Sequence, residues 1–250
     1  MHFDLLTLIA LGLVGVVAGF VDAIAGGGGL IAVPALLTAG LPPVAAFATN
    51  KLQSAVGTAI AATTYWRRGF VDLSAIGGGV LAMLIGSFLG ALVVKQIDTT
   101  VLSYVVPVAL ICIAIYFTFA PRLTDADSHA RLDFQVFVPV MGLVIGFYDG
   151  VLGPGTGSFL TLGFIALFGL GVTRAAANTK FLNLASNVGA LALFIPSGDV
   201  VWPIAVTMAV GQIVGGYLGA LTGIRFGARL IKPLVVVISI ALAVRLLVFR

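Results

Sequence analysis

Two lysines and two aspartates stand inside apolar segments of this sequence, at matching places in its two halves. Asp22 precedes Lys51 in the first half, and Asp149 precedes Lys180 in the second. A charged side chain at membrane depth is costly unless it is paired or faces water, so such residues usually mark a functional site. Two lysines at equivalent places predict one central, positively lined cavity that binds an anion.

Glycine clusters separate each aspartate from its lysine. Glycine permits a sharp turn and a close approach of the backbone to a ligand, so we expect each cluster to be the tip of a broken helix. The helix that restarts after a break presents unpaired N–H groups and a positive dipole end, which together bind anions. Alternatively, the glycines only allow close helix packing. The glycines predicted to face the ligand are Gly26, Gly27, Gly28, Gly29, Gly153, Gly155 and Gly157, whereas Gly86, Gly90, Gly215 and Gly219 are typical of packing positions.

Amide and hydroxyl side chains lie near both lysines. Asn50 and Ser54 are four residues apart, as are Asn183 and Asn187, and this spacing puts each pair on one helix face. Thr156 and Ser158 add hydroxyl donors beside the second glycine cluster. The alternative is that each lysine reaches the membrane interface or is neutralised by the aspartate of its own half. Besides the glycines, the residues predicted to bind substrate are Asn50, Lys51, Ser54, Thr156, Asn178, Lys180 and Asn183.

Asp22 and Asp149 are predicted to be coupling or structural acids. A carboxylate in a medium of low dielectric constant can exchange a proton during transport. Such a carboxylate can equally cap a broken helix or hold Lys51 and Lys180 in place. The sequence leaves these roles open.

The composition predicts an integral membrane protein. Of the 250 residues, 60% are apolar and 9% are charged, against a charged share of about a quarter in soluble domains. The mean hydropathy is +1.20. We expect the first segment, Leu5 to Ala25, to stay in the protein, because it lacks a basic leader and a cleavage site. The single Cys112 and the two histidines predict no metal site and no cofactor, and the basic residues predict topology rather than nucleic-acid binding.

Glycine, proline and charged residues divide the chain into two sets of apolar segments. The duplication extends beyond the glycine clusters, since Gly69 matches Gly198 and IGSFLGALV from Ile85 matches VGGYLGALT from Val214. The sequence therefore predicts a first transmembrane repeat at 1–120, a charged linker loop at 121–133 and a second repeat at 134–250, which together form one membrane domain. The expected segments are 5–25, 29–40, 44–66, 73–94 and 99–119 in the first half, and 134–152, 157–169, 173–195, 200–222 and 229–248 in the second.

Two topologies fit these segments, with roughly six to eight membrane crossings in all. The halves are parallel if each short segment extends the one before it. They are inverted if the long and short segments form a re-entrant hairpin, and the loop arginines then gather on the cytoplasmic side. We favour this second, all-helical arrangement. It predicts that the two glycine tips meet near the bilayer midplane, and that residues 121–133 and Arg67–Arg68 lie on one, cytoplasmic, side.

The repeated pattern resembles one family of membrane transporters. The first copy reads GFVD, GGGG and TNKLQ, and the second reads GFYDG, GPGTG and NTK, followed by Asn183 and Asn187. This pattern is similar to that of the TauE/SafE family, and the resemblance covers nearly the whole chain. It implies transport of sulfite, sulfonates and related organosulfur compounds. The halves differ in one detail, since Asn178-Thr179-Lys180 stands where the first half has Thr49-Asn50-Lys51.

We therefore expect a multi-pass protein of the bacterial inner membrane that transports small anions and is not an enzyme. Its expected partners are the lipid bilayer and a small anionic substrate, without nucleic acid, and a homo-oligomer is compatible with the sequence. An anion channel is an alternative. An intramembrane aspartyl protease, in which Asp22 and Asp149 would form a dyad, is a weaker one because two lysines oppose a shared proton.

Overall fold

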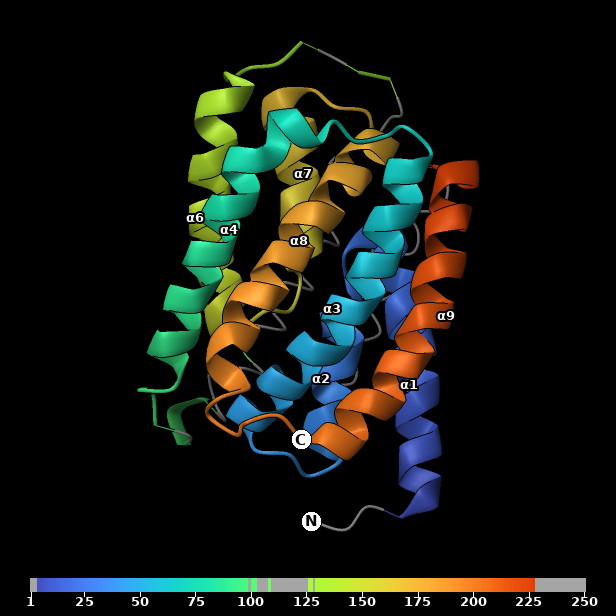
Figure 1. The fold of residues 1–250 in the computed structure, drawn as a ribbon, viewed down its shortest axis with the longest axis vertical. Helices are drawn as coiled ribbons and strands as arrows, with labels where there is room; N and C mark the ends of the chain where they lie inside the picture. Colours follow the sequence, from blue (N-terminus) through green and yellow to red (C-terminus); the bar gives the residue numbers. More distant parts are fainter. Residues whose placement is uncertain (1–3, 99, 103–107, 109–125, 128, 228–250) are drawn as a thin grey trace.

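The computed structural model describes residues 4–98, 100–102, 108, 126–127 and 129–227. This part of the chain is helical and contains no strand. The expected segments agree with the helices to within four residues, but most of 99–119 and all of 229–248 lie outside the described residues. The helices are α1 (Leu5–Ala25), α2 (Gly28–Thr38), α3 (Pro43–Arg67), α4 (Leu73–Val94), α6 (Phe134–Val151), α7 (Thr156–Phe168), α8 (Val172–Phe194) and α9 (Trp202–Phe226) (Figure 1).

Four long helices form two pairs. In each pair the two helices run in the same direction and come from different halves of the chain. Helix α1 packs on α9, and α4 packs on α6. Glycines let the backbones approach closely, because a β-carbon on Gly219 would stand 2.9 Å from the side chain of Ala23. The other predicted packing glycines, Gly86, Gly90 and Gly215, likewise face the backbone of the partner helix, which confirms their packing role.

Helices α3 and α8 pack against each other between these pairs (Figure 1). By length and composition, α1, α4, α6 and α9 are apolar enough to cross a membrane. The polar residues of α3 and α8 lower the hydropathy of these two helices, but at 25 and 23 residues both are long enough to cross. Their polar side chains are buried, as Lys51 and Lys180 illustrate. The centre of the bundle is therefore polar.

The outer faces of the pairs are apolar. Large side chains such as Leu13 on α1, Leu81 on α4, Val144 on α6 and Val210 on α9 are at least 60% exposed. In water such a surface would be an aggregation hazard, whereas in a bilayer it contacts lipid tails. The chain is thus built as a multi-pass cell membrane protein.

Each half contains a hairpin of one long and one short helix. Helix α1 ends near Gly219 of α9, although α9 continues to Phe226. Helix α2 then turns back, because Leu36 near its end shares an apolar cluster with Leu11 of α1. In the second half the ring of Phe168, at the end of α7, lies 5.2 Å from the ring of Phe134 at the start of α6. Both breaks therefore lie inside the bundle (Figure 1).

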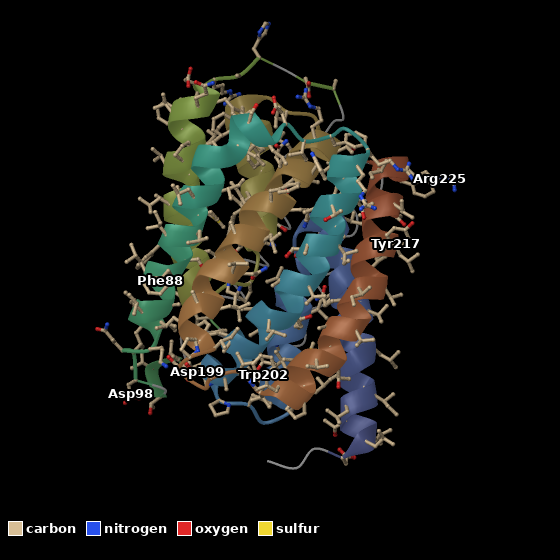
Figure 2. All side chains as sticks on the ribbon, viewed as in Figure 1. Phe88, Asp98, Asp199, Trp202, Tyr217 and Arg225 are labelled. Carbon is tan, nitrogen blue, oxygen red and sulfur yellow. The ribbon has the colours of Figure 1, made fainter. Side chains whose placement is uncertain are left out.

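Corresponding helices of the two halves run in opposite directions. In Figure 1, α1 and α3 run upward while their counterparts α6 and α8 run downward, and α4 runs downward while α9 runs upward. From the helix ends, one end of the bundle carries Arg67, Arg68, Arg131, Arg174 and Arg225, and the other carries Asp4, Lys95, Asp98 and Asp199. Figure 2 shows Arg225 at the first end and Asp98 and Asp199 at the second.

The described part of the 121–133 linker lies at the arginine-rich end. Asp127 there forms an ion pair with Arg174 and accepts a hydrogen bond from the main-chain N–H of Gly171 (2.6 Å). The Gly171 N–H, with help from the Arg174 guanidinium, holds the pKa of Asp127 below its ordinary value. The described residues of the linker and Arg67–Arg68, which end α3, therefore lie at the same end of the bundle (Figure 1).

Candidate functional site

The two helix breaks touch at the centre of the bundle. A β-carbon on Gly157, at the start of α7, would stand 2.5 Å from the α-carbon of Gly26, which follows α1. Gly26 also has a φ of 75°, a conformation that only glycine adopts without strain. On the other side, a β-carbon on Gly29 would stand 3.3 Å from the α-carbon of Pro154. The contact between the tips is confirmed.

A small cavity lies between the tips and the crossing of α3 with α8. Its volume is about 10 Å³, which is room for about one water molecule. All of its walls come from the helix breaks, from the ends of α1 and α6, and from the middle of α3 and α8. The residues that form the walls are Asp22, Gly26, Gly29, Asn50, Lys51, Ser54, Asp149, Gly153, Gly155, Thr156, Gly157, Asn183 and Asn187.

A buried ion pair spans the cavity wall. The Nζ atom of Lys51 on α3 lies 2.5 Å from Oδ2 of Asp149 on α6, and each side chain is only 3% exposed. The hydroxyl of Thr156 donates to Oδ1 of Asp149 at 2.7 Å, and the hydroxyl of Ser186 donates to Oδ2. The carboxylate therefore has a lysine and two hydroxyls as hydrogen-bond partners.

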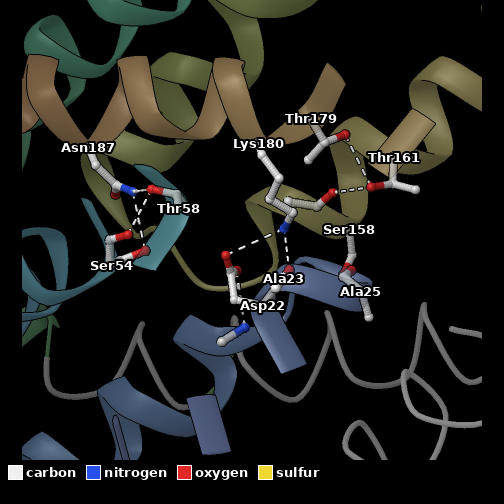
Figure 3. A network of polar contacts seen from close by, with 12 residues as sticks. Asp22, Ala23, Ala25, Ser54, Thr58, Ser158, Thr161, Thr179, Lys180 and Asn187 are labelled. Carbon is white, nitrogen blue, oxygen red and sulfur yellow. Dashed lines mark hydrogen bonds and ion pairs between the residues drawn. The ribbon is translucent and has the colours of Figure 1, made fainter. Parts of the chain in front are cut away.

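A second ion pair lies beside the cavity, at the end of α1. Lys180 on α8 donates to the main-chain carbonyl of Asp22, and its Nζ lies 3.4 Å from the Asp22 carboxylate (Figure 3). Oδ1 of Asp22 accepts from the main-chain N–H of Gly28, the first residue of α2. The Lys180 side chain has no exposed surface.

Two further side chains bind the last carbonyls of α1. The Tyr65 hydroxyl donates to the carbonyl of Ala23 (3.1 Å), and the Ser158 hydroxyl donates to that of Ala25 (2.7 Å). Helix C-terminal carbonyls have no partner within the helix and carry the negative end of the dipole, so a lysine and hydroxyls stabilise them. With Lys180, these contacts cap the break in α1 from three other helices. Figure 3 shows Lys180 and Ser158 beside the end of α1.

Each lysine is paired with the aspartate of the other half. Lys51 of the first half binds Asp149, and Lys180 of the second half binds Asp22. The alternative in which each lysine is neutralised by its own half's aspartate is therefore wrong. The physical reason is that the two helix breaks touch where α3 packs on α8, so each acid, which stands just before its own break, reaches the lysine of the other half.

Amides and hydroxyls meet where α3 crosses α8. The Asn187 amide donates to the Ser54 hydroxyl at 3.2 Å and to the Thr58 hydroxyl at 3.4 Å. The Gln53 amide donates to Oδ1 of Asn50 at 2.8 Å, which orients Asn50 in the wall. Among the described residues no three metal-ligating side chains come together.

Comparison with known proteins identifies the family. Residues 11–246 match the family model for the sulfite exporter TauE/SafE. The chain belongs to the TauE/SafE family. It is 47% identical to a probable membrane transporter protein, ORF9, of a Sinorhizobium species over 92% of this chain and 88% of that protein. It is 42% identical to the probable membrane transporter protein YfcA of Escherichia coli K12, over 94% of this chain and 87% of YfcA.

A third relative, a probable membrane transporter protein of Haemophilus influenzae, is 41% identical over 93% of this chain and 91% of that protein. No solved structure matches the chain significantly. With its multi-pass architecture and these relatives, the protein is a membrane transporter.

Most residues predicted to bind substrate in this TauE/SafE protein lie in the cavity wall, but four do not. Gly27 and Gly28 lie behind the wall at the start of α2, and Lys180 is enclosed at the end of α1. Asn178 donates to the carbonyl of Arg174 in its own helix and faces a separate hollow of about 330 Å³ at the arginine-rich end. Ser158, predicted as a donor, binds the Ala25 carbonyl instead.

Sequence reasoning missed Ser186, Thr58 and Gln53. The duplication contained a signal for Thr58, because it stands seven residues after Lys51, as Asn187 does after Lys180. Ser186 gave no such signal, since its counterpart in the first half is Gly57. Its contact with Asp149 depends on the packing of α8 against α6, for which the sequence carries no signal.

Proposed function

We propose that this transporter carries small anions, with sulfite, sulfonates and related organosulfur compounds as substrates, and binds them in the cavity between the two helix breaks. One observation carries the proposal: the cavity wall combines a lysine ammonium with the first turn of α7, at the place where two broken helices touch. An ammonium and the N-terminal end of a helix are both anion-binding groups.

The donors around the cavity suit a tetrahedral oxyanion. Lys51 contributes a charged donor, Thr156 a hydroxyl, and Asn50 and Asn183 contribute amides. A sulfur oxyanion is larger than the water molecule for which the cavity has room, so the walls must separate to admit it. Movement of the two hairpins relative to α3 and α8 would open the site to one side at a time, which is the behaviour of a carrier.

We infer that residues 1–120 and 134–250 are inverted repeats and that their shared site lies near the bilayer midplane. The opposite directions of α1 and α6 and of α3 and α8 support this inference. Lys51 also lies eight residues into α3, which is about 12 Å from the start of the helix. The arginine-rich end then faces the cytoplasm under the positive-inside rule.

The two alternative functions fit the geometry less well. An anion channel needs a continuous wet path, whereas this cavity is small and enclosed by side chains from both halves. An aspartyl protease needs two carboxylates that share one proton. Asp22 and Asp149 instead each bind a separate lysine.

Flux measurements in proteoliposomes test the proposal. We expect purified protein to move sulfite, methanesulfonate and taurine-like sulfonates, but not equally small cations, at rates typical of carriers. The Lys51→Met variant should lose this flux, and Lys95→Met should retain it, because Lys95 lies on the surface in an ion pair with Asp199. Failure of wild-type protein to move or bind any sulfur oxyanion would reject the substrate class, and flux far above carrier turnover would favour a channel.

A further inference from the structure

We propose that Asp149 is the proton-binding site of this transporter, and that one proton on Asp149 frees Lys51 to hold one monovalent anion. The inference rests on the proposed function, because it concerns how the same cavity takes up its substrate. It assigns different roles to two ion pairs that occupy equivalent places in the two halves.

The two ion pairs stand differently relative to the cavity. Lys51 and Asp149 both form part of the cavity wall, so an anion entering the cavity meets the Lys51 ammonium directly. Lys180 is not in the wall, and it is held by both the main-chain carbonyl and the carboxylate of Asp22. The Lys51 pair can respond to a ligand, whereas the Lys180 pair fixes the end of α1.

The two acids differ in their hydrogen-bond partners. Asp22 is bound by the N–H of Gly28 and the ammonium of Lys180, which can only donate. Those two partners require Asp22 to remain an acceptor. Asp149 is bound by the Lys51 ammonium, which can only donate, and by the hydroxyls of Thr156 and Ser186, which can rotate to accept as well as donate. Asp149 can therefore gain a proton without leaving either hydroxyl unsatisfied, provided that Lys51 turns to an anion in the cavity.

The charged groups around Asp149 come from several helices. Asp149 is faced by Lys51 from α3, while Asp22 from α1 lies in the same cavity wall and is bound by Lys180 from α8. The neighbouring Tyr148 hydroxyl donates to the Pro154 carbonyl. From α4 the hydroxyl of Ser87, which is not titratable, donates to the Ser186 carbonyl.

These four charged groups sum to zero while Asp149 is ionised. An anion added to a neutral site of low dielectric constant leaves an unpaired buried charge, which is costly. When Asp149 takes one proton from solution, its O–H bond forms and the Lys51 ammonium transfers its hydrogen bond to the entering anion. The loaded site is neutral again with one proton and one monoanion. Transport of that pair is electroneutral, so a pH gradient drives it and a membrane potential does not.

Methanesulfonate is the probe that tests this inference, because it stays a monoanion at all working pH values, so any proton taken up on binding goes to the protein. Binding to the purified full-length protein is measured by calorimetry across a pH series, in buffers of different ionisation enthalpy. We expect uptake of about one proton per anion on the alkaline side, with an apparent Kd that rises about tenfold per pH unit.

Substitution of Asp149 and of two control sites tests which residue takes up the proton when the anion binds. Asp149→Asn should bind methanesulfonate with a Kd that does not depend on pH and without proton uptake. The double variant Lys180→Met/Asp22→Asn should keep the pH dependence, and so should Asp199→Asn, which alters a surface ion pair. The wild-type proton count requires no variant, so poor folding of Asp149→Asn would not rescue the proposal.

The outcomes are distinct. Wild-type binding of methanesulfonate without proton uptake would overturn the role of Asp149 and leave the proposed function standing. Proton uptake that survives in Asp149→Asn would also overturn that role. Absence of binding for methanesulfonate, sulfite and every other sulfur oxyanion would reject both proposals.

Discussion

Replacement of Lys180 by methionine tests whether the second ion pair holds the fold together. The substitution keeps the volume of the side chain but removes the ammonium that binds the carbonyl and the carboxylate of Asp22. At 3.4 Å and with an effective dielectric constant of about 20, the attraction between the two charges is about 5 kcal/mol. Loss of one partner from a buried pair costs about 3–5 kcal/mol, because the remaining charge is left uncompensated.

The double variant Lys180→Met/Asp22→Asn should recover about 2–3 kcal/mol of this loss, since neither charge then remains buried. Denaturant unfolding in detergent, followed by circular dichroism, measures each step of the cycle. The control is Lys95→Met, whose partly exposed ion pair with Asp199 should cost less than about 1 kcal/mol. A Lys180→Met protein as stable as the control, or a double variant as unstable as the two single losses combined, would refute the structural role of this pair.

Three other experiments test the contact between the breaks, the linker and the topology. Gly157→Ala should cost about 1–3 kcal/mol in thermal unfolding because its β-carbon would overlap the first break, whereas Gly77→Ala, with open space around it, should be neutral or slightly stabilising. Asp127→Asn should lower stability by up to about 1 kcal/mol at neutral pH; since folding depresses the pKa of Asp127, this difference should vanish as the pH falls through that lowered pKa. In a background without the native cysteine, an impermeant maleimide should label Arg68→Cys from the cytoplasmic side and Gln96→Cys from the outside, and labelling of both from one side would contradict the inferred topology.

The helices could be predicted from the sequence because their signals are local. Runs of apolar residues bounded by proline, glycine and aspartate fix the ends of most helices to within a few residues. Asp72 and Asp133, for example, accept hydrogen bonds from the first turns of α4 and α6. The repeated glycine clusters predicted both breaks, because few other residues tolerate the backbone angles at Gly26 and Gly155.

The pairing of charges could not be predicted, because it depends on packing between the halves. The spacing from Asp22 to Lys51 is similar to that from Asp149 to Lys180, so the sequence suggested pairing within each half as the alternative to substrate contact. The contact between the two helix breaks instead brings each acid to the lysine of the opposite half. The position of Asn178 was missed for a related reason, since the Asn178 amide, two places before Lys180, donates to a carbonyl of its own helix instead.

The two halves contain corresponding helices, but side chains at corresponding positions make different contacts. Asn50 lies in the cavity wall, whereas its counterpart Thr179 lies within 3.1 Å of the Thr161 hydroxyl and ties α8 to α7. Ser186 binds Asp149, whereas its counterpart Gly57 packs against the side chain of Gln212.

A site with exact twofold symmetry would offer two equivalent lysines and two equivalent acids, and it would bind an anion in two orientations with either acid taking the proton. The differences around Lys51 and Lys180 remove that degeneracy, because Lys51 lines the cavity and Lys180 does not. In addition, the hydroxyl partners of Asp149 can reverse their hydrogen bonds, whereas the N–H and the ammonium that bind Asp22 can only donate. In the proposed mechanism the inverted repeat would supply the motion between two open forms, and its divergence from symmetry would leave one ammonium for one anion and one carboxylate for one proton.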